Sequence, residues 1–267
     1  NSSLSSQQNV LSSNRYDIPD AADVTVAYGE APRSALSHSF IQALIWNIHK
    51  GSKKSFSAEY QSFTRNMDLI LTQEFVSSPQ VLQSLSLTNY KYQLATSFIY
   101  QSNKQRTGVA TASPAECTSV QAHITEDLEP VVNTPKATLF TRYKVEQREE
   151  ELLVVNVHGR NRGGLQPFER QLTQIAAVMA AHDGPILFAG DFNTNNKQKY
   201  EYLMRYAKEL ELETVAFEKS GDYRTVSKLS RYALDHVFVR GLKVLDAKVL
   251  QVTGSDHNAM QLKMQVM

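Results

Sequence analysis

Short apolar runs recur along the chain and alternate with amphipathic segments. Runs of four to eight apolar residues bounded by turn signals are typical of buried strands, and apolar residues at helical spacing indicate helices. The segment 168–181 has such spacing, with Leu172, Ile175, Ala176 and Met179 on one face. The pattern predicts strands at 40–47, 68–74, 92–99, 108–112, 137–143, 152–157, 185–190, 234–239, 244–252 and 259–267, and helices at 55–67, 168–181 and 196–210. This mixture of adjacent strands and helical crossovers predicts an α/β fold.

The N-terminal segment differs in composition from the rest of the chain. Its first 14 residues, NSSLSSQQNVLSSN, are polar and low in complexity, a composition that cannot bury enough apolar surface to fold by itself. We therefore expect a flexible lead-in over 1–39 and a single domain over 40–267.

Composition limits the function classes more than it selects one. The 267 residues are 42% hydrophobic, which suffices for a substantial core, and the net charge of +1 provides no general basic field for nucleic acid. The single Cys117 excludes an intramolecular disulfide and a cysteine zinc set, and a small buried hydrophobe is its expected role. A monomer is expected.

No apolar run approaches the roughly 18 to 20 residues that span a bilayer, so no transmembrane segment is expected. The chain begins at Asn1 rather than Met, which leaves room for a removed signal or anchor. The compartment therefore stays open, with the cytoplasm as first choice.

Polar residues stand where the apolar runs stop, and they carry the candidate chemistry. Loops at strand ends are where a rigid scaffold presents catalytic groups. Carboxylate and amide oxygens suit a hard cation such as Mg²⁺, and histidines can donate to phosphate oxygens. This set predicts metal-assisted phosphoester hydrolysis by Asn47, Glu74, His158, Asp191, Asn193, Asp235, Asp256 and His257.

The motifs WN, QE, GDFN, LD before an apolar strand, and SDH occur in one order over roughly residues 40 to 266. In this order the chain resembles the endonuclease/exonuclease/phosphatase superfamily, which includes deoxyribonuclease I, exonuclease III, neutral sphingomyelinases and inositol polyphosphate 5-phosphatases. The likeness is greatest to an uncharacterised bacterial branch, although Ala259 stands where that family usually has proline. The resemblance implies a four-layer sandwich of two packed mixed β-sheets flanked by helices.

The resemblance also implies roles for individual residues. Glu74 would be the principal Mg²⁺ ligand, with Mn²⁺ as a possible substitute. Asp191 would position the nucleophile or manage leaving-group protons, and Asn193 would stabilise the pentacovalent centre. Taken alone, DFN would be better interpreted as an Asx-type turn, and Asn47 could bind the ion, bind phosphate or cap a turn.

The spacing of the remaining residues suggests how they cooperate. Asp256 and His257 are adjacent, so in extended chain one can face metal while the other approaches phosphate. Asp235 could orient His257 through the ring nitrogen that does not touch substrate, and His158 would be a second phosphate donor. His236 is expected to pack or lie at the surface, and His49 could lie near the site or pack at a strand end.

Basic residues gather in the loops beside these motifs, whereas acidic residues concentrate at 146–151 and 209–213. We expect Arg106, Arg160, Asn161 and Arg162 to contact substrate phosphates on a locally positive rim. The alternative is that these charges are simply solvated loop residues.

The leading hypothesis is a Mg²⁺-dependent phosphodiester hydrolase, a nuclease acting on DNA, because rim charge could follow successive phosphates. One alternative is a phosphoesterase acting on a phospholipid, an inositol phosphate or another small phosphoester. The other is a noncatalytic phosphate-binding adaptor on the same fold, which would not need both a nucleophile-positioning carboxylate and metal ligands.

Overall fold

Continuous apolar runs form strands that are buried on both faces, which is why they lack a polar alternation. The computed structural model describes residues 15–218 and 221–267. In β3 (Ile41–Asn47), Ala43 and Ile45 contribute to the core between two sheets, whereas Leu44 and Trp46 pack toward helices. Each such strand therefore joins two hydrophobic layers.

The larger sheet has eight strands in the described part of the chain, in the order β1-β5-β6-β4-β3-β14-β13, with β2 also paired to β5. Their bounds are β1 Tyr16–Asp17, β2 Thr25–Tyr28, β4 Leu69–Val76, β5 Lys91–Tyr100, β6 Arg106–Ser113, β13 Leu242–Leu250 and β14 Ala259–Val266.

The smaller sheet has six strands among the same residues, in the order β11-β12-β10-β9-β8-β7. Their bounds are β7 Cys117–Ile124, β8 Ala137–Tyr143, β9 Leu152–His158, β10 Ile186–Asp191, β11 Glu213–Thr214 and β12 Asp235–Arg240.

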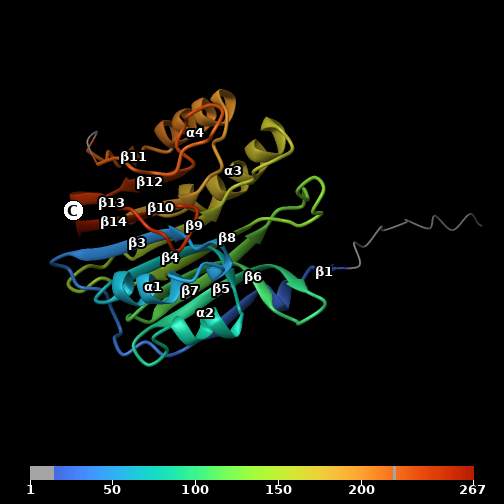
Figure 1. Ribbon diagram of the computed structural model, residues 1–267. Coiled ribbons are helices and arrows are strands. Elements are labelled where there is room, and N and C mark those ends of the chain that lie inside the picture. Colours follow the sequence, from blue (N-terminus) through green and yellow to red (C-terminus); the bar gives the residue numbers. More distant parts are fainter. Residues whose placement is uncertain (1–14, 219–220) are drawn as a thin grey trace, which may run out of the picture.

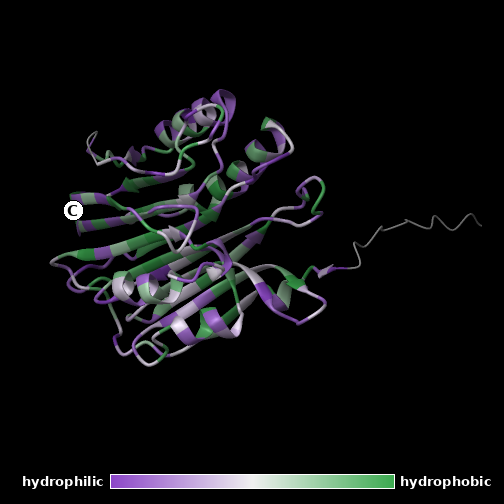
Figure 2. Cartoon of the chain, in the orientation of Figure 1, coloured by the Kyte–Doolittle hydropathy of each residue, from purple (hydrophilic) through white to green (hydrophobic). Residues whose placement is uncertain are grey.

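Helices cover the outer face of each sheet (Figure 1). α1 (Phe56–Thr64) and α2 (Pro79–Ser84) pack on the larger sheet, and α3 (Leu165–Ala180) and α4 (Lys197–Glu209) pack on the smaller one. Two short 3₁₀ turns, Ala21–Asp23 and His49–Gly51, complete the regular elements. Hydrophobic residues follow the central strands, and hydrophilic residues cover the outward side of α4 (Figure 2). The expected four-layer α/β sandwich is confirmed. None of the helices in the described ranges is long and apolar enough to cross a bilayer.

The segment before residue 40 differs from the expectation. Residues 15–39 carry β1 and β2, which pair with β5, and Leu36 is 1% exposed in the core between the sheets. Backbone pairing and burial of Leu36 hold this segment in place, so the domain includes residues from 15 onward. Residues 1–14, the polar part of the expected lead-in, lie outside the described residues.

His236 is buried in the smaller sheet, as a packing residue. Its ring lies among the rings of Phe192 and Phe238, and Nε2 is 2.8 Å from the Thr194 hydroxyl and 3.0 Å from the Ala233 carbonyl oxygen. Burial, followed by the charge of Arg224, lowers the pKa of His236 to about 3. The folded protein therefore holds this imidazole neutral.

This burial predicts a pH dependence of stability. Between the ordinary pKa of 6.5 and about 3, the unfolded chain binds a proton that folded His236 refuses. The free energy of unfolding should therefore fall as the pH falls through this window, and His236 should contribute at most about 1.4 kcal/mol per pH unit. Urea unfolding of wild type and His236→Gln at several pH values between 7 and 4 measures this. Equal slopes for the two proteins would contradict the prediction.

Candidate active site

The strand register brings most of the predicted site residues to one edge of the two sheets. β9 and β10 are parallel, and His158 is the direct neighbour of Asp191. β10 and β12 are antiparallel, and Asp235 is the neighbour of Asp191 on the other side. β3 runs parallel to β4, so Asn47 and Glu74 reach the corresponding edge of the larger sheet.

The carboxylate of Asp191 is the point on which donors converge. It is 1% exposed, and its Oδ2 accepts hydrogen bonds from Asn47 Nδ2 at 3.0 Å and Asn193 Nδ2 at 3.3 Å. The Nε2 atoms of His158 and His257 lie 3.7 Å and 3.8 Å from the same oxygen. Burial raises the pKa of Asp191, while His257 opposes the rise. Such a carboxylate, flanked by two imidazoles, is suited to accept and hold a proton.

His257 is fixed on both sides. Its Nδ1 lies 2.9 Å from Asp235 Oδ2, and its backbone carbonyl accepts a hydrogen bond from Trp46 Nε1 at 2.8 Å. Burial lowers the pKa of His257, but the Asp235 and Asp191 carboxylates outweigh it and raise the pKa above the ordinary value. The expected orientation of His257 by Asp235 is therefore present, with Nε2 directed toward Asp191.

Lys136 is a site residue that the sequence analysis missed. Its Nζ lies 3.0 Å from His158 Nε2. A lysine ammonium only donates, so His158 Nε2 accepts and the ring proton resides on Nδ1. Burial and then Lys136 lower the pKa of His158 well below its ordinary value. In the sequence, Lys136 is one lysine before an apolar strand, and no motif marks it.

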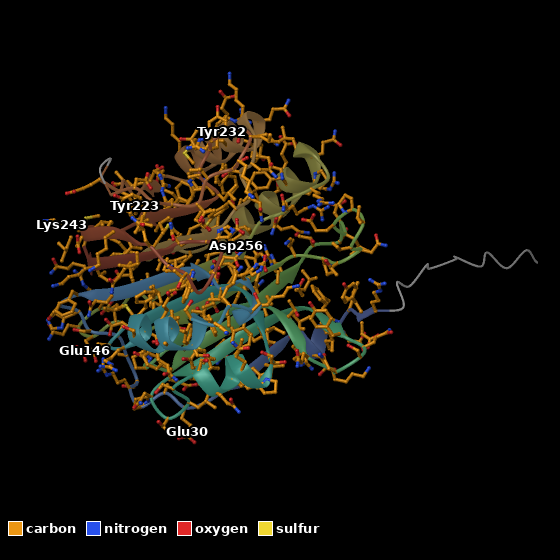
Figure 3. The ribbon with its side chains drawn as sticks, in the orientation of Figure 1. Glu30, Glu146, Tyr223, Tyr232, Lys243 and Asp256 are labelled. Atoms are coloured by element: carbon orange, nitrogen blue, oxygen red, sulfur yellow. The ribbon has the colours of Figure 1, made fainter. Side chains whose placement is uncertain are left out.

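The side chain of His49 lies between the carboxylates of Glu74 and Asp256. The Nδ1 atom of His49 lies 3.8 Å from Glu74 Oε2 and 3.3 Å from Asp256 Oδ1. Asp256 is labelled near the centre of Figure 3, and its side chain is 56% exposed. Asn47 is adjacent, since its Oδ1 accepts the His49 backbone N–H at 3.0 Å. His49 was expected either near the site or packed at a strand end, and the structure places it near the site.

Two groups of side chains could be considered for a divalent cation. Ligand atoms of Asp191, Asp235 and His257 lie within 4.8 Å of one another, but Nδ1 of His257 is already engaged with both Asp235 oxygens. The carboxylates of Glu74 and Asp256 keep most of their oxygen lone pairs available, and Asn47 Oδ1 retains one. This donor set of hard oxygens fits Mg²⁺ or Mn²⁺.

A β-bulge places Glu74. The pairing of β4 with β6 shifts register between Thr72 and Phe75, and Glu74 adopts φ 51°. The buried Gln73 donates to Asn156 Oδ1 at 2.7 Å, and Asn156 Nδ2 donates to the Ala110 carbonyl at 3.0 Å. This buried amide pair joins the two sheets directly beneath the site. Asn156 was missed, although a single polar residue inside the apolar run LLVVNVH is a visible signal.

The expected basic rim holds only in part. Arg160 is 1% exposed, and its guanidinium donates to the backbone carbonyls of Asp127 and Leu128, so it is not a surface phosphate contact. Its burial and its hydrogen bonds to this loop keep the guanidinium away from the surface where substrate would bind. Arg106 is half-buried and donates to the Asp23 carbonyl at 2.8 Å.

The neighbouring loop residues keep their side chains at the surface. Asn161 and Arg162 are exposed, and their backbone N–H groups donate to the Glu129 carboxylate. The Asn161 Oδ1 accepts a hydrogen bond from Asn195 Nδ2 at 2.8 Å. Among Arg106, Arg160 and Arg162, Arg162 is therefore the arginine that the structure leaves exposed.

A carboxylate on α1 holds the loop that carries Asp256 and His257. Glu59 accepts hydrogen bonds from the Thr253 N–H at 3.1 Å and the Gly254 N–H at 2.8 Å. A Cβ at Gly254 would lie 2.7 Å from Glu59 Oε2 and 2.9 Å from Phe56 Cα, so glycine permits the close approach. Ser255 then donates to the Asn47 carbonyl at 2.6 Å. The loop is thus attached to both α1 and β3.

Comparison with known proteins places this arrangement in a wider group. A family model described as the Endonuclease/Exonuclease/phosphatase family matches residues 44–257. A UPF0294 protein of Photorhabdus laumondii is 32% identical over 221 residues, covering 82% of this chain and 81% of that protein. One from Klebsiella pneumoniae is also 32% identical over 221 residues, covering 82% and 79%.

Solved structures show the same fold. The endonuclease/exonuclease/phosphatase from Beutenbergia cavernae superimposes with a TM-score of 0.66 at 16% identity, covering 85% of this chain and 72% of that chain. The endonuclease domain of TRAS1, a telomere-specific retrotransposon, gives a TM-score of 0.58 at 17% identity, covering 85% and 99%. At these identities the likeness concerns the fold alone.

The Glu59 contacts predict a local effect on the loop. Replacing Glu59 with Ala removes a charged acceptor, and hydrogen bonds to charged groups each contribute about 1.5 to 3 kcal/mol. Hydrogen exchange at the Thr253 and Gly254 amides should accelerate by at least about tenfold. Glu209→Ala, which removes an exposed partner of Arg205 on α4, is the matched control. Unchanged exchange in Glu59→Ala would show that other contacts hold the loop.

Proposed function

The chain belongs to the endonuclease/exonuclease/phosphatase family, and on that premise we propose that it is a divalent-metal-dependent phosphodiester hydrolase that acts on nucleic acid. Family members include nucleases, phosphatases and phosphodiesterases. DNA is the first substrate to test.

The observation that carries this proposal is the shared contact of two imidazoles and two amides with one buried carboxylate oxygen. His158, His257, Asn47 and Asn193 all meet Asp191 Oδ2 within 3.8 Å. A noncatalytic phosphate site would place donors only, because a buried carboxylate repels phosphate. A carboxylate at the centre of the donors suits proton removal from water beside a bound phosphate.

The residues have complementary tasks in this proposal. Asp191 orients the attacking water and accepts its proton at Oδ2. His257 donates from Nε2 to a phosphate oxygen, while Asp235 fixes its ring through Nδ1. Asn193 would turn one Nδ2 hydrogen from its 3.3 Å contact with Asp191 Oδ2 to the same phosphoryl group as negative charge develops there. Asp191 holds Asn193 in place, since its Oδ1 accepts the Asn193 N–H at 2.9 Å.

Glu74, Asp256 and Asn47 would hold the divalent cation, with His49 beside them. A bound Mg²⁺ or Mn²⁺ would supply Lewis-acid stabilisation of the charge that develops on phosphate. The role of second phosphate donor, expected of His158, is proposed for the Lys136 ammonium, which His158 holds in place by accepting its hydrogen bond at Nε2.

A few exposed basic side chains around the site favour a polyanionic substrate. Lys53, Lys54 and Arg162 are exposed in loops at this edge, and Arg106 is half-buried beside it. We propose Arg162 as the phosphate contact of the expected group, with Asn161 beside it. Arg160 is a structural residue of the loop rather than a substrate ligand.

Metal binding is tested with Glu74. The change Glu74→Gln preserves size and removes the charge of a ligand, so the apparent affinity for Mg²⁺ in a turnover assay should fall by at least about tenfold. Glu201→Gln is the control, because Glu201 is an exposed residue of α4 paired with Lys197. Wild-type turnover by Glu74→Gln at limiting metal would remove Glu74 from the site.

Proton transfer is tested with Asp191 and His257. Asp191→Asn and His257→Ala should each lower kcat on a cleaved diester by about 10² to 10⁴. Circular dichroism and thermal unfolding check that each variant folds. Near-native rates for both would overturn the mechanism, whereas a loss confined to KM would reduce them to binding residues.

A further inference from the structure

A cavity of about 180 Å³ opens beside the proposed catalytic residues. The proposed mechanism assigns no part of the substrate to it. Glu74, Lys136 and His158 line it together with side chains from β1, β5 and β6. A substrate group attached to the reacting phosphate would therefore meet this cavity directly.

Three aromatic rings form part of its wall. The ring of Tyr16 lies 4.9 Å from that of Phe98 and 5.5 Å from that of Tyr100, and Phe98 and Tyr100 are 5.3 Å apart. All three side chains are half-buried, so each keeps part of its surface open. Mutually packed rings lose little freedom on binding and provide a rigid apolar surface.

The N-terminal segment is held in place so that it contributes Tyr16. Tyr16 pairs with Tyr100 in the backbone register of β1 and β5. The Asp17 carboxylate accepts hydrogen bonds from Gln101 at 2.7 Å and from Lys104 at 3.2 Å. These contacts anchor β1, a strand of only two residues, at the edge of the cavity.

A buried polar group also faces the cavity without a partner. Thr107 is 5% exposed and lines the cavity, and its hydroxyl makes no hydrogen bond within the described residues. Buried hydroxyls are generally satisfied, so this one is available to a polar edge of a molecule in the cavity.

The charged side chains on the cavity wall limit which planar ring ligand can bind. Lys50 Nζ donates to the Tyr100 hydroxyl at 3.0 Å and lies 5.7 Å from the centre of that ring. Lys136 is also on the wall, and the Glu74 carboxylate would be bound to the metal in the proposed function, so a cationic group such as a quaternary ammonium would be repelled. A neutral planar ring with hydrogen-bonding edges, linked to a phosphate, satisfies the rings, the Thr107 hydroxyl and the lysines together.

We propose that this cavity binds an unpaired nucleobase of the nucleotide that carries the reacting phosphate. A base inside a duplex is stacked and paired, so it could enter a cavity of this size only after leaving the stack. Stacking on aromatic side chains tolerates different bases. The inference rests on the proposed function for the reaction, and it narrows the substrate to single-stranded or unpaired nucleic acid.

Binding without turnover tests the cavity directly. Isothermal titration of the full chain in chelator compares a deoxynucleoside 5′-monophosphate with deoxyribose 5-phosphate, which lacks the base. We expect the nucleotide to bind at least about tenfold more tightly, as base stacking predicts. Equal affinities, or no binding of the nucleotide at millimolar concentration, would overturn the proposal.

Variants assign the difference to the cavity. Phe98→Ala should bring the two affinities toward equality, and Thr107→Val, which keeps the shape and removes the hydroxyl, should do so partially. Phe40→Ala is the matched control, because Phe40 is an exposed aromatic before β3, at the end of that strand opposite Asn47. If Phe98→Ala does not fold, Thr107→Val alone decides, and a wild-type preference in it would count against the proposal.

Turnover separates this inference from the proposed function. Metal-supplemented protein is assayed on bis(p-nitrophenyl) phosphate, single-stranded DNA, the same strand with one abasic residue, and duplex DNA. Cleavage of DNA with no preference for the base-bearing single strand would leave the hydrolase and reject the base site. Base-dependent nucleotide binding with no cleavage of any diester would reject the hydrolase and retain the base site.

Discussion

The buried carboxylate of Asp191 is the constraint on which the site depends. An ionised carboxylate without partners in the protein interior is very costly, so its neighbours must supply donors. Here its contacts come from four separate segments. The amides of Asn47 on β3 and Asn193 after β10 donate to it, and the imidazoles of His158 on β9 and His257 before β14 lie within 3.8 Å of it. Satisfying one charge therefore fixes the relative positions of both sheets at their shared edge.

That edge is defined by backbone pairing rather than by the loops themselves. The register of β9, β10 and β12 sets His158, Asp191 and Asp235 side by side. The bulge at Glu74 and the Gln73–Asn156 hydrogen bond then connect this row to the larger sheet. A buried amide pair of this kind is satisfied only in one alignment, so it favours one packing of the sheets.

The segment before β3 helps to enclose the site. Tyr16 belongs to a strand of two residues, which contributes little stability by itself, yet its side chain forms part of the cavity wall beside Glu74. The same cavity takes Lys136 from the loop before β8. Segments far apart in the sequence thus surround one reacting position, as is common for sites built on loops above a rigid scaffold.

Local patterns in the sequence were enough to locate most of the strands and the order of their polar ends. A residue such as Asp191 ends a continuous apolar run, and both the run and its end are local properties of the chain. The long helices and ten strands could be located in this way, whereas β1, β2, β7, β11 and α2 are short or lack apolar runs and were not predicted. Tertiary structure alone decided that Lys136 contacts His158, that Arg160 is buried by a loop, and that Tyr16 lines the cavity. These positions depend on contacts between segments far apart in the chain, and hydrogen bonds and packing of that kind leave no periodic signal in the sequence.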